Sequence, residues 1–512
     1  MQTFSVHTID LQRRRSAKAW RHSYFLWLAI AVLASLGAAS GVSAGTSLAL
    51  WSLITGALVT LVRPVVGVYI ITFFALAGDS VTVIWYPFYK NLSSPESLLF
   101  LDRHLAVSPL ECFLVLTMIA WIVHLVGRRA TFVRGSLLVP VLVFSGFVLL
   151  GILRTASGGA NRNVALWEAR TLVYAPIVYV LATNLFTRKE HYNTLFWLIC
   201  AAIFVDSLFA IGYFITLSGT AKDALESLGE HSASLHADLL FVLLLAVWLL
   251  PNASKSRRFG LLAMAVPVFI VYFIAHRRAA FVVLGVGLVL LAVSLYRTRR
   301  RYFWSIVPVV SLVALGYLGA FWNSQGSVGF PAQSVKSVVS PGQVSERDRS
   351  SDLYRIVETA DVVATIRAAP LVGIGFGQPF YRPYPLPNLS FWVFSDFITH
   401  NGILWVWMKL GVGGFVAMLY LFAAAIRDGG RAVLRLPRND YAAITIGATG
   451  FVMMYAIFAY VDIGWDSQST VCLGAAFAVI ANIERLHGLR APQRRVRRSV
   501  HPRAEAIVPI RP

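Results

Sequence analysis

Residues 279–296 read AAFVVLGVGLVLLAVSLY, and the arginine-rich sequence RTRRR follows at 297–301. The first stretch contains no charged side chain, and roughly 20 such residues in a helix cross the hydrocarbon core of a bilayer. A helix also satisfies all of its backbone polar groups internally, as lipid requires. Because arginines concentrate at the cytoplasmic ends of membrane spans, the stretch predicts a transmembrane helix that ends in the cytoplasm.

Similar apolar runs fill most of the 512-residue chain, in which 57% of residues are hydrophobic and only 13% are charged. A soluble protein carries about 25% charged residues, so an ordinary soluble enzyme is excluded. The sequence predicts an all-α polytopic integral membrane protein with about fourteen transmembrane helices, in a range of about 12–14. The predicted spans are 24–41, 44–62, 64–83, 108–126, 136–153, 169–186, 194–217, 236–252, 259–275, 279–296, 302–321, 401–426, 441–461 and 468–483.

Positive charge is distributed unevenly along the chain. The 45 Lys and Arg exceed the 24 Asp and Glu, which gives a net charge of +21. With the N-terminus in the cytoplasm, every predicted cytoplasmic connection is basic, as the positive-inside rule requires. The predicted organisation is a basic cytoplasmic N-terminus at 1–23, transmembrane helices 1–11 at 24–321, a large periplasmic or extracytoplasmic loop at 322–400, transmembrane helices 12–14 at 401–483, and a basic cytoplasmic tail at 484–512.

The two terminal segments each allow a second interpretation. The tail sequence APQRRVRRSVHPR at 491–503 could bind nucleic acid, but a place beside an anionic leaflet favours a solvated tail with no nucleic-acid partner. Residues 24–44 could be a cleaved signal peptide, because Val42, Ser43 and Ala44 are similar to a cleavage site. The later topology is the same in either case.

The large outer loop is expected to contain one amphipathic helix after an irregular segment at 322–348. Ser350 or Ser351 can cap this helix, and Pro370 ends it. An apolar stripe predicts that the helix lies on the bilayer surface or caps the bundle, with Arg355 and Glu358 on its other face. The stripe consists of Leu353, Ile356, Val357, Ala360, Val363 and Ile366.

Several kinds of chemistry have no sequence signal here. The predicted cytoplasmic segments are too short for a cytosolic catalytic domain, and there is no P-loop. No cluster of His, Cys, Asp or Glu has metal-ligand spacing, and the three cysteines lie far apart. The glycines of PLVGIGFG at 370–377 lack the dinucleotide spacing and predict a tight turn or close backbone approach. We therefore expect no cofactor, no resident metal, and chemistry at the outer face.

Arg277 and Arg278 lie in a short outer connection, where the positive-inside rule disfavours arginine. They could extend to the membrane interface as ordinary amphipathic side chains. Alternatively, they form a cationic site for an anion such as a lipid phosphate or diphosphate, which the planar guanidinium binds well. The second interpretation makes this connection a candidate binding site.

Further polar residues mark the ends of other predicted spans. His400 opens the twelfth span beside Asn401, where it could be a polar cap or a general base, since histidine titrates near neutral pH. Glu168 and Arg170 begin the sixth span, as an internal ion pair or as part of a site.

Asp206 and Lys409 lie within predicted spans, at depths where ionisable groups are functional candidates by default. They could instead pair with each other or with the backbone. They are also the only support for an alternative function, a membrane transporter or flippase for a lipid-linked saccharide, which predicts ionisable groups near the bilayer midplane.

Two sequence blocks in the second half of the chain share a pattern with a known family. HRRAAFVVLGVG at 276–287 is similar to that family's Ser-Arg block at the start of a span, with Arg278 matching its arginine and Arg277 replacing Ser. RIVETADVVATIRAAPLVGIGFG at 355–377 is similar to its block of an arginine, a helix and Pro-Leu-x-Gly-x-Gly, with Arg355 at the arginine.

A third block, HNGILWVWMKLGVGG at 400–414, is similar to the family's His-Asn pair followed by Gly-x-x-Gly, and His400 and Asn401 match directly. Together, in this order and at the outer face, the three blocks resemble the O-antigen ligase and O-antigen polymerase family of bacterial polysaccharide assembly. Thr359 stands where the family has an aromatic residue, and fourteen spans exceed its usual number of about twelve.

This resemblance implies an inverting, metal-independent glycosyltransferase of the C type in the bacterial inner membrane, with its active site facing the periplasm. The donor would be a glycan on undecaprenyl diphosphate, and the acceptor lipid A-core for a ligase or another lipid-linked glycan for a polymerase. The resemblance assigns the catalytic roles to His400, Arg278 and Arg355. We add Arg277, Arg170 and Asn401 as substrate-binding candidates.

Overall fold

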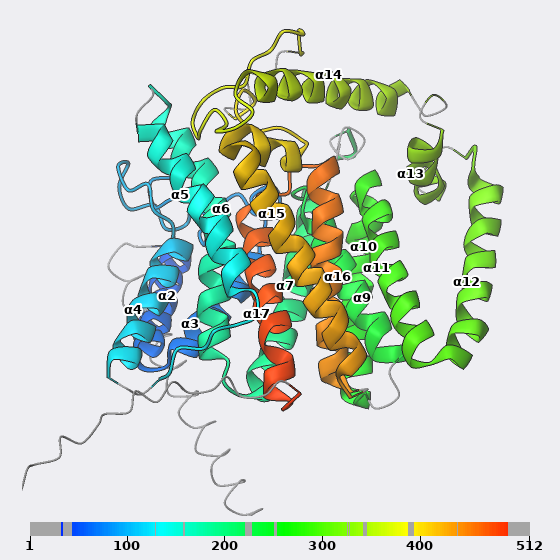
Figure 1. Ribbon diagram of the computed structural model, residues 1–512, viewed down its shortest axis with the longest axis horizontal. Helices are drawn as coiled ribbons and strands as arrows, with labels where there is room; N and C mark the ends of the chain where they lie inside the picture. The colour runs from blue at the N-terminus through cyan, green and yellow to red at the C-terminus, as the bar shows by residue number, and fades with distance from the viewer. Residues whose placement is uncertain are drawn as a thin grey trace, which may run out of the picture.

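The protein is built from helices, and its described part contains no strand (Figure 1). A computed structural model describes residues 32–33, 43–127, 130–156, 159–220, 228–249, 253–324, 326, 328–340, 342, 346–387, 394–437 and 439–489. The helices are α2 (Ala44–Val62), α3 (Pro64–Leu76), α4 (Pro109–Val126), α5 (Leu138–Ala156), α6 (Arg162–Leu185), α7 (Lys189–Thr216), α9 (Ala233–Leu249), α10 (Lys255–Ile274), α11 (Arg278–Thr298), α12 (Arg300–Phe321), α13 (Phe330–Val339), α14 (Glu346–Ala368), α15 (Gly402–Arg435), α16 (Asp440–Val461) and α17 (Ser467–Leu486).

The predicted all-α polytopic fold is confirmed. Among the described residues, 11 helices are long and apolar enough to cross a membrane. The shorter apolar helices α3 and α9 coincide with two further predicted spans. The first predicted span, 24–41, lies outside the described residues except for 32–33, so the count of fourteen stays a prediction.

The centre of the bundle is formed by α16 and α17, which are almost entirely buried. α17 packs against α6, while α16 packs against α15, α9 and α11. At Gly474 of α17, a Cβ atom would lie 2.5 Å from the carbonyl oxygen of Ala175 in α6. Small residues therefore let these two helices approach closely, as is usual where lipid supplies no hydrophobic driving force between helices.

At the edge of the bundle, α12 stands beyond α11 and has no buried residue (Figure 1). It packs mainly on α11 and α13. Its exposed side chains include Val309, Leu312 and Leu315, which suit the hydrocarbon of a bilayer.

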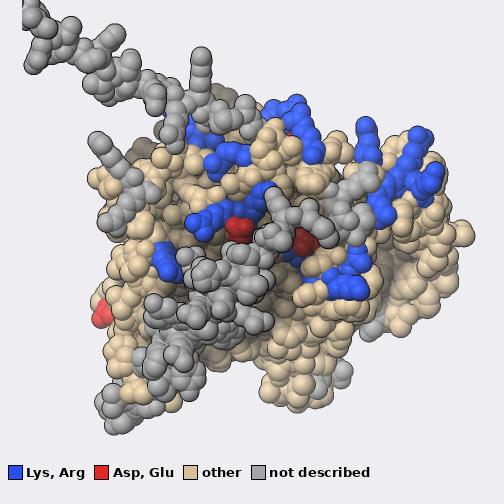
Figure 2. All heavy atoms as spheres, turned by 90° about the horizontal axis from the view of Figure 1, so that it is seen from below, with Lys and Arg blue, Asp and Glu red and all other residues tan. Residues whose placement is uncertain are grey.

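The two ends of the bundle differ in charge and in structure. Figure 2 shows Lys and Arg gathered over the lower face, where connections predicted to be cytoplasmic lie. Exposed arginines on these connections are Arg63, Arg134, Arg188, Arg297, Arg300, Arg301, Arg427, Arg431 and Arg435. α14 crosses the opposite end (Figure 1), and the connections predicted to face outward contact one another there. This separation agrees with the predicted alternation of the spans.

Three details of the prediction were wrong. The third span was predicted at 64–83, but α3 ends at Leu76 and the chain then enters a partly buried connection. The segment 322–348 was predicted to be irregular, yet it contains α13, which begins beside Pro331. Finally, α14 begins at Glu346, so neither Ser350 nor Ser351 caps it, although it does end before Pro370 as predicted.

The face of α14 that packs on the bundle is its polar face and not its apolar stripe. Leu353 and Ile356 are 60% and 66% exposed, whereas Glu358 and Asp361 are buried. Of the six residues in the predicted apolar stripe, only Ile366 is buried. The polar face of α14 packs on the bundle, because it supplies hydrogen-bonding groups to connections below it, and part of the apolar stripe faces outward.

Candidate functional site

His400 lies directly before α15 and is held by a carboxylate of α14. Its Nδ1 is 3.1 Å from Oε2 of Glu358 and 3.2 Å from Oε1, and its backbone N–H donates to Oε2 at 2.8 Å. Glu358 is 1% exposed. Because a carboxylate only accepts hydrogen bonds, Nδ1 is the donor of this pair, and in the neutral tautomer that makes the same contact Nε2 carries the lone pair. This arrangement is that of an oriented base.

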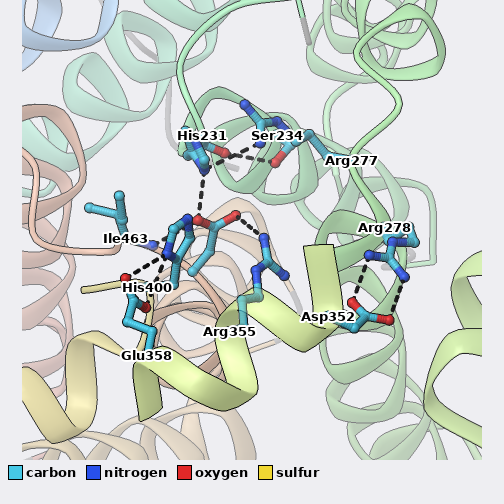
Figure 3. A network of polar contacts seen from close by, with 10 residues as sticks. His231, Ser234, Arg277, Arg278, Asp352, Arg355, Glu358, His400 and Ile463 are labelled. Atoms are coloured by element: carbon cyan, nitrogen blue, oxygen red, sulfur yellow. Dashed lines mark hydrogen bonds and ion pairs between the residues drawn. The ribbon is translucent and has the colours of Figure 1, made fainter. Parts of the chain in front are cut away.

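A second histidine–carboxylate pair faces the first (Figure 3). Nδ1 of His231, in the connection before α9, lies 2.7 Å from Oδ1 of Asp462, which follows α16. The ring centroids of His231 and His400 are 6.4 Å apart. Nη1 of Arg277 lies 3.2 Å from Nδ1 of His231, and Nη2 of Arg355 lies 3.8 Å from Oδ2 of Asp462. The fold thus brings two histidines and two arginines together around Asp462.

Asp462 is the negative centre of this group. It is 1% exposed, and burial by itself would raise its pKa. His231, Arg355 and Arg277 outweigh burial and lower the pKa of Asp462 below its ordinary value. Asp462 is therefore ionised, and it holds the cationic side chains at the site.

Arg278 begins α11 and lies at one side of the group (Figure 3). Its Nη1 and Nη2 donate to the two carboxylate oxygens of Asp352 at 3.1 and 2.8 Å. Asp352, Arg355 and Glu358 are three residues apart along α14, so they share one face of that helix. Through this face α14 contacts the start of α11, the connection after α16 and the start of α15.

The remaining two predicted residues have different surroundings. Arg170 is buried, and its Nη1 donates to Asn91 at 2.8 Å and to Glu111 at 3.4 Å. It lines the same cavity as His231, but it does not pair with Glu168 as one interpretation predicted. Asn401 is the N-cap of α15, where its Oδ1 accepts from Leu404 N at 3.0 Å. The capping residue is therefore Asn401 rather than His400.

Glu168 instead forms a fully buried ion pair with Lys409 of α15 at 2.8 Å. Lys409 Nζ also donates to the carbonyl of Gln378 at 2.7 Å, and Gly377 N donates to the second oxygen of Glu168 at 2.6 Å. Of the two pairings that the sequence left open for Lys409, the one with the backbone is therefore present, whereas its ionic partner is Glu168 and not Asp206. The pair anchors the glycine-containing segment of the outer loop to the bundle.

This glycine segment packs onto a break in α15 at Gly411, where φ is +72°. A Cβ at Gly411 would lie 2.2 Å from the carbonyl of Leu371, and one at Gly373 would lie 2.6 Å from the carbonyl of Lys409. The predicted role of the glycines in close backbone approach is confirmed. Carbonyls freed by the break accept from the segment, since Ile374 N donates to Met408 at 2.8 Å.

Sequence reasoning missed His231 and Asp462, and it placed Glu358 on the face of α14 opposite the apolar stripe without assigning it to the site. Each had a weak signal that could have been used. His231 and Asp462 lie in connections predicted to face outward, and Glu358 is one turn from Arg355. No group of three or more possible metal ligands occurs within the described ranges.

An apolar groove lies next to the arginines. It has a volume of about 600 Å³ and is lined by residues of α9 to α13, including Phe273, Phe281 and Tyr317. Phe281 is three residues after Arg278, and the ring of His276 contacts Phe330 at 5.1 Å between centroids. The Arg277–Arg278 turn is therefore close in the chain to the lining of this apolar groove.

Residues 263–419 match the model of the O-antigen ligase family. The resemblance to the O-antigen ligase family is confirmed. The matched residues include Arg277, Arg278, Arg355, His400 and Asn401, and with them Glu358. Asp352 also lies within the matched range, whereas His231, Asp462 and Arg170 lie outside it.

An O-antigen ligase of Salmonella typhimurium is 27% identical to the chain over 207 residues. The similarity covers 35% of this chain and 49% of that ligase, so the chain spans about half the length of the curated relative that it matches.

Proposed function

We propose that the protein transfers a glycan from undecaprenyl diphosphate to lipid A-core at the periplasmic face of the bacterial inner membrane. A polymerase that uses another lipid-linked glycan as acceptor is the alternative within the same chemistry. The observation that carries the proposal is the pairing of His400 with Glu358 beside Arg277 and Arg355. The matched family and the Salmonella relative are both named O-antigen ligase, which favours ligation over polymerisation.

In the proposed reaction, His400 is the general base. The acceptor hydroxyl gives its proton to Nε2 of His400 as its oxygen attacks the anomeric carbon of the donor sugar. Glu358 stabilises the imidazolium that forms and keeps Nδ1 in the protonated state. A single displacement of this kind inverts the configuration at the anomeric carbon.

The leaving group is the lipid diphosphate, whose negative charge grows as the glycosidic bond breaks. Arg278, Arg277 and Arg355 supply positive charge without a metal in this proposal, and the guanidinium fork fits phosphate oxygens. The bidentate pair of Arg278 with Asp352 shows that its fork is already oriented. On binding, the diphosphate of the donor would replace Asp352 as the hydrogen-bond acceptor of Arg278.

The apolar groove between α9 and α13 suits the isoprenoid chain of the donor. Its lining is aromatic and aliphatic, and its volume of about 600 Å³ is in the usual range of about 300–1,000 Å³ for ligand sites. With the chain in the groove, the diphosphate would lie at the Arg277–Arg278 turn.

Transfer from a purified donor tests the proposal. The full-length protein in nanodiscs, given polyprenyl diphosphate-linked glycan and lipid A-core, is expected to release lipid diphosphate and form the ligated product with inverted configuration. His400→Ala should lose activity, whereas His104→Ala, at an exposed histidine of another predicted outer connection, should keep it. Retention of the donor's configuration would contradict the single displacement.

The transporter alternative has lost part of its support. Lys409 is one of its two candidate residues. It binds Glu168 and the backbone carbonyl of Gln378, and these contacts give it a structural role. Transfer chemistry by the purified protein would separate the two functions, because a flippase moves the donor without breaking its glycosidic bond.

A further inference from the structure

A polar cavity lies beside the reacting centre, separate from the apolar groove. Its volume is about 530 Å³, which is within the usual range of about 300–1,000 Å³ for ligand sites. Its walls come from the connection between α3 and α4, the first part of α6, the residues before α9, residue Phe394, and the connection between α16 and α17. We propose that this cavity binds a saccharide of the transfer reaction, either the donor glycan or the acceptor core; this inference rests on the proposed function.

One wall of the cavity is aromatic. The rings of Trp167 and Phe394 stack with their centroids 4.4 Å apart and their planes 25° apart, and Trp465 lies in the same wall. Trp167 and Phe394 are half-buried, so each ring keeps an exposed part. A pyranose ring has a flat face of C–H groups, and an aromatic ring is the side chain whose apolar surface and negative face match it.

Another wall carries oriented hydrogen-bonding groups. Asn91 Oδ1 is held by Arg170 at 2.8 Å, and Glu96 Oε1 is held by Lys90 at 3.2 Å. A carboxylate accepts from sugar hydroxyls, and the amide of Asn91 both donates and accepts. Because cations already fix both side chains, they would lose little freedom when a sugar binds.

The charge balance of the cavity distinguishes a sugar from a phosphate. Lys90 and Arg170 are accompanied by Glu96, Glu230 and Asp466 in the same lining. Burial raises the pKa of Glu230 to about 7 and that of Asp466 to about 6, so both acids are partly neutral near neutral pH. Because the two cations are accompanied by three acids, the lining favours a hydroxyl-rich, uncharged ligand over an anion.

The cavity also reaches the site of chemistry. His231 lines it and contacts both Arg277 and Asp462 in the reacting centre. A saccharide bound in the cavity would therefore lie next to the proposed reaction centre, where the acceptor hydroxyl attacks the anomeric carbon. This placement is what a subsite for the neighbouring sugars of one substrate requires.

Binding of lipid-free saccharides to the full-length protein in nanodiscs tests the inference. The two probes are the core oligosaccharide and the O-chain oligosaccharide, both released from lipopolysaccharide, with binding measured by saturation-transfer NMR titration. One probe should bind, which identifies the source of the sugar. Trp167→Ala should raise its Kd roughly tenfold, since an aromatic face is lost. Glu96→Gln, at a half-exposed loop residue where folding is not at risk, should also weaken binding.

Trp85→Ala is the matched control, because Trp85 is 48% exposed on the same α3–α4 connection and does not line the cavity. Its Kd should equal that of the wild type. Equal affinity in wild type, Trp167→Ala and Glu96→Gln, or no binding of either probe, overturns the inference. His400→Ala should keep saccharide binding while losing transfer. Saccharide binding without any transfer by the wild type would refute the proposed function alone.

Discussion

Glu358→Gln tests the proposed base through a residue that the structure, rather than the sequence, identified. The substitution keeps the size and shape of the side chain. The amide oxygen of Gln, at the position of Oε2, can still accept from the backbone N–H of His400, now a 2.8 Å contact, and the amide nitrogen then takes the position of Oε1, where it can donate to Tyr354 Oη. The amide N–H₂ then faces Nδ1 of His400 and donates to it. Because this donor stands at the 3.2 Å position of Oε1, the substitution favours the tautomer in which Nδ1 accepts and Nε2 carries the ring proton.

This change of tautomer removes the lone pair that receives the proton of the acceptor hydroxyl. Loss of a positioned general base costs about 10²–10⁴-fold in rate, which is roughly 2.7–5.4 kcal/mol of transition-state stabilisation. We expect a loss of this size in the rate of glycan transfer, with the protein still folded. The thermal midpoint should change little, because the backbone contact of His400 persists.

The assay is the rate of glycan transfer by the purified protein across a range of pH. In the wild type the transfer rate should rise with pH as the imidazole of His400 becomes neutral. In Glu358→Gln the residual transfer rate should no longer show this rise with pH. Asp396→Asn is the control, since it removes a 58%-exposed carboxylate of the same outer loop that pairs with Arg382. A near-normal rate for Glu358→Gln, or a wild-type rate that falls as pH rises, would refute the base assignment.

Three further predictions concern the arginines, the buried ion pair and the topology. Arg278→Lys and Arg355→Lys should each lose most transfer activity while inserting normally, because lysine lacks the planar fork; near-normal transfer would make that arginine structural. Lys409→Met leaves a buried carboxylate unpaired and should lower the free energy of unfolding by about 3–5 kcal/mol, as measured by denaturation in nanodiscs. Topology reporters fused at residue 340 should report a periplasmic location, and those fused at residue 432 a cytoplasmic one. A cytoplasmic signal at residue 340 would contradict the outer-face site.

Many elements of the fold could be predicted from the chain alone. The run at 279–296 corresponds to α11, and the arginines at 297–301 lie at its end. Length and hydropathy were sufficient because a membrane span must satisfy its backbone internally and present about 20 apolar residues to lipid. The short blocks also located Arg277, Arg278, Arg355 and His400, which the structure brings to one end of the bundle.

The orientation of α14 could not be predicted in the same way. In a soluble protein an apolar stripe marks the buried face of a helix, and by that rule the stripe that contains Leu353 and Ile356 would pack on the bundle, which is one of the two positions predicted for this helix. At a membrane surface an apolar stripe can also face lipid, so the pattern alone does not say which face is buried. The structure decides it, because Glu358 and Asp361 find hydrogen-bond partners in the connections beneath α14.

The sequence by itself determined which segments are apolar enough to span, which connections are basic, and which residue types are available at the outer end. Only the tertiary structure decided which helix ends meet. His231 and Asp462 are 231 positions apart, and Glu168 and Lys409 come from different helices. The physical reason is that lipid-exposed apolar helices carry little periodic information about their neighbours. Close backbone approach at glycines and a few buried polar pairs set their arrangement instead.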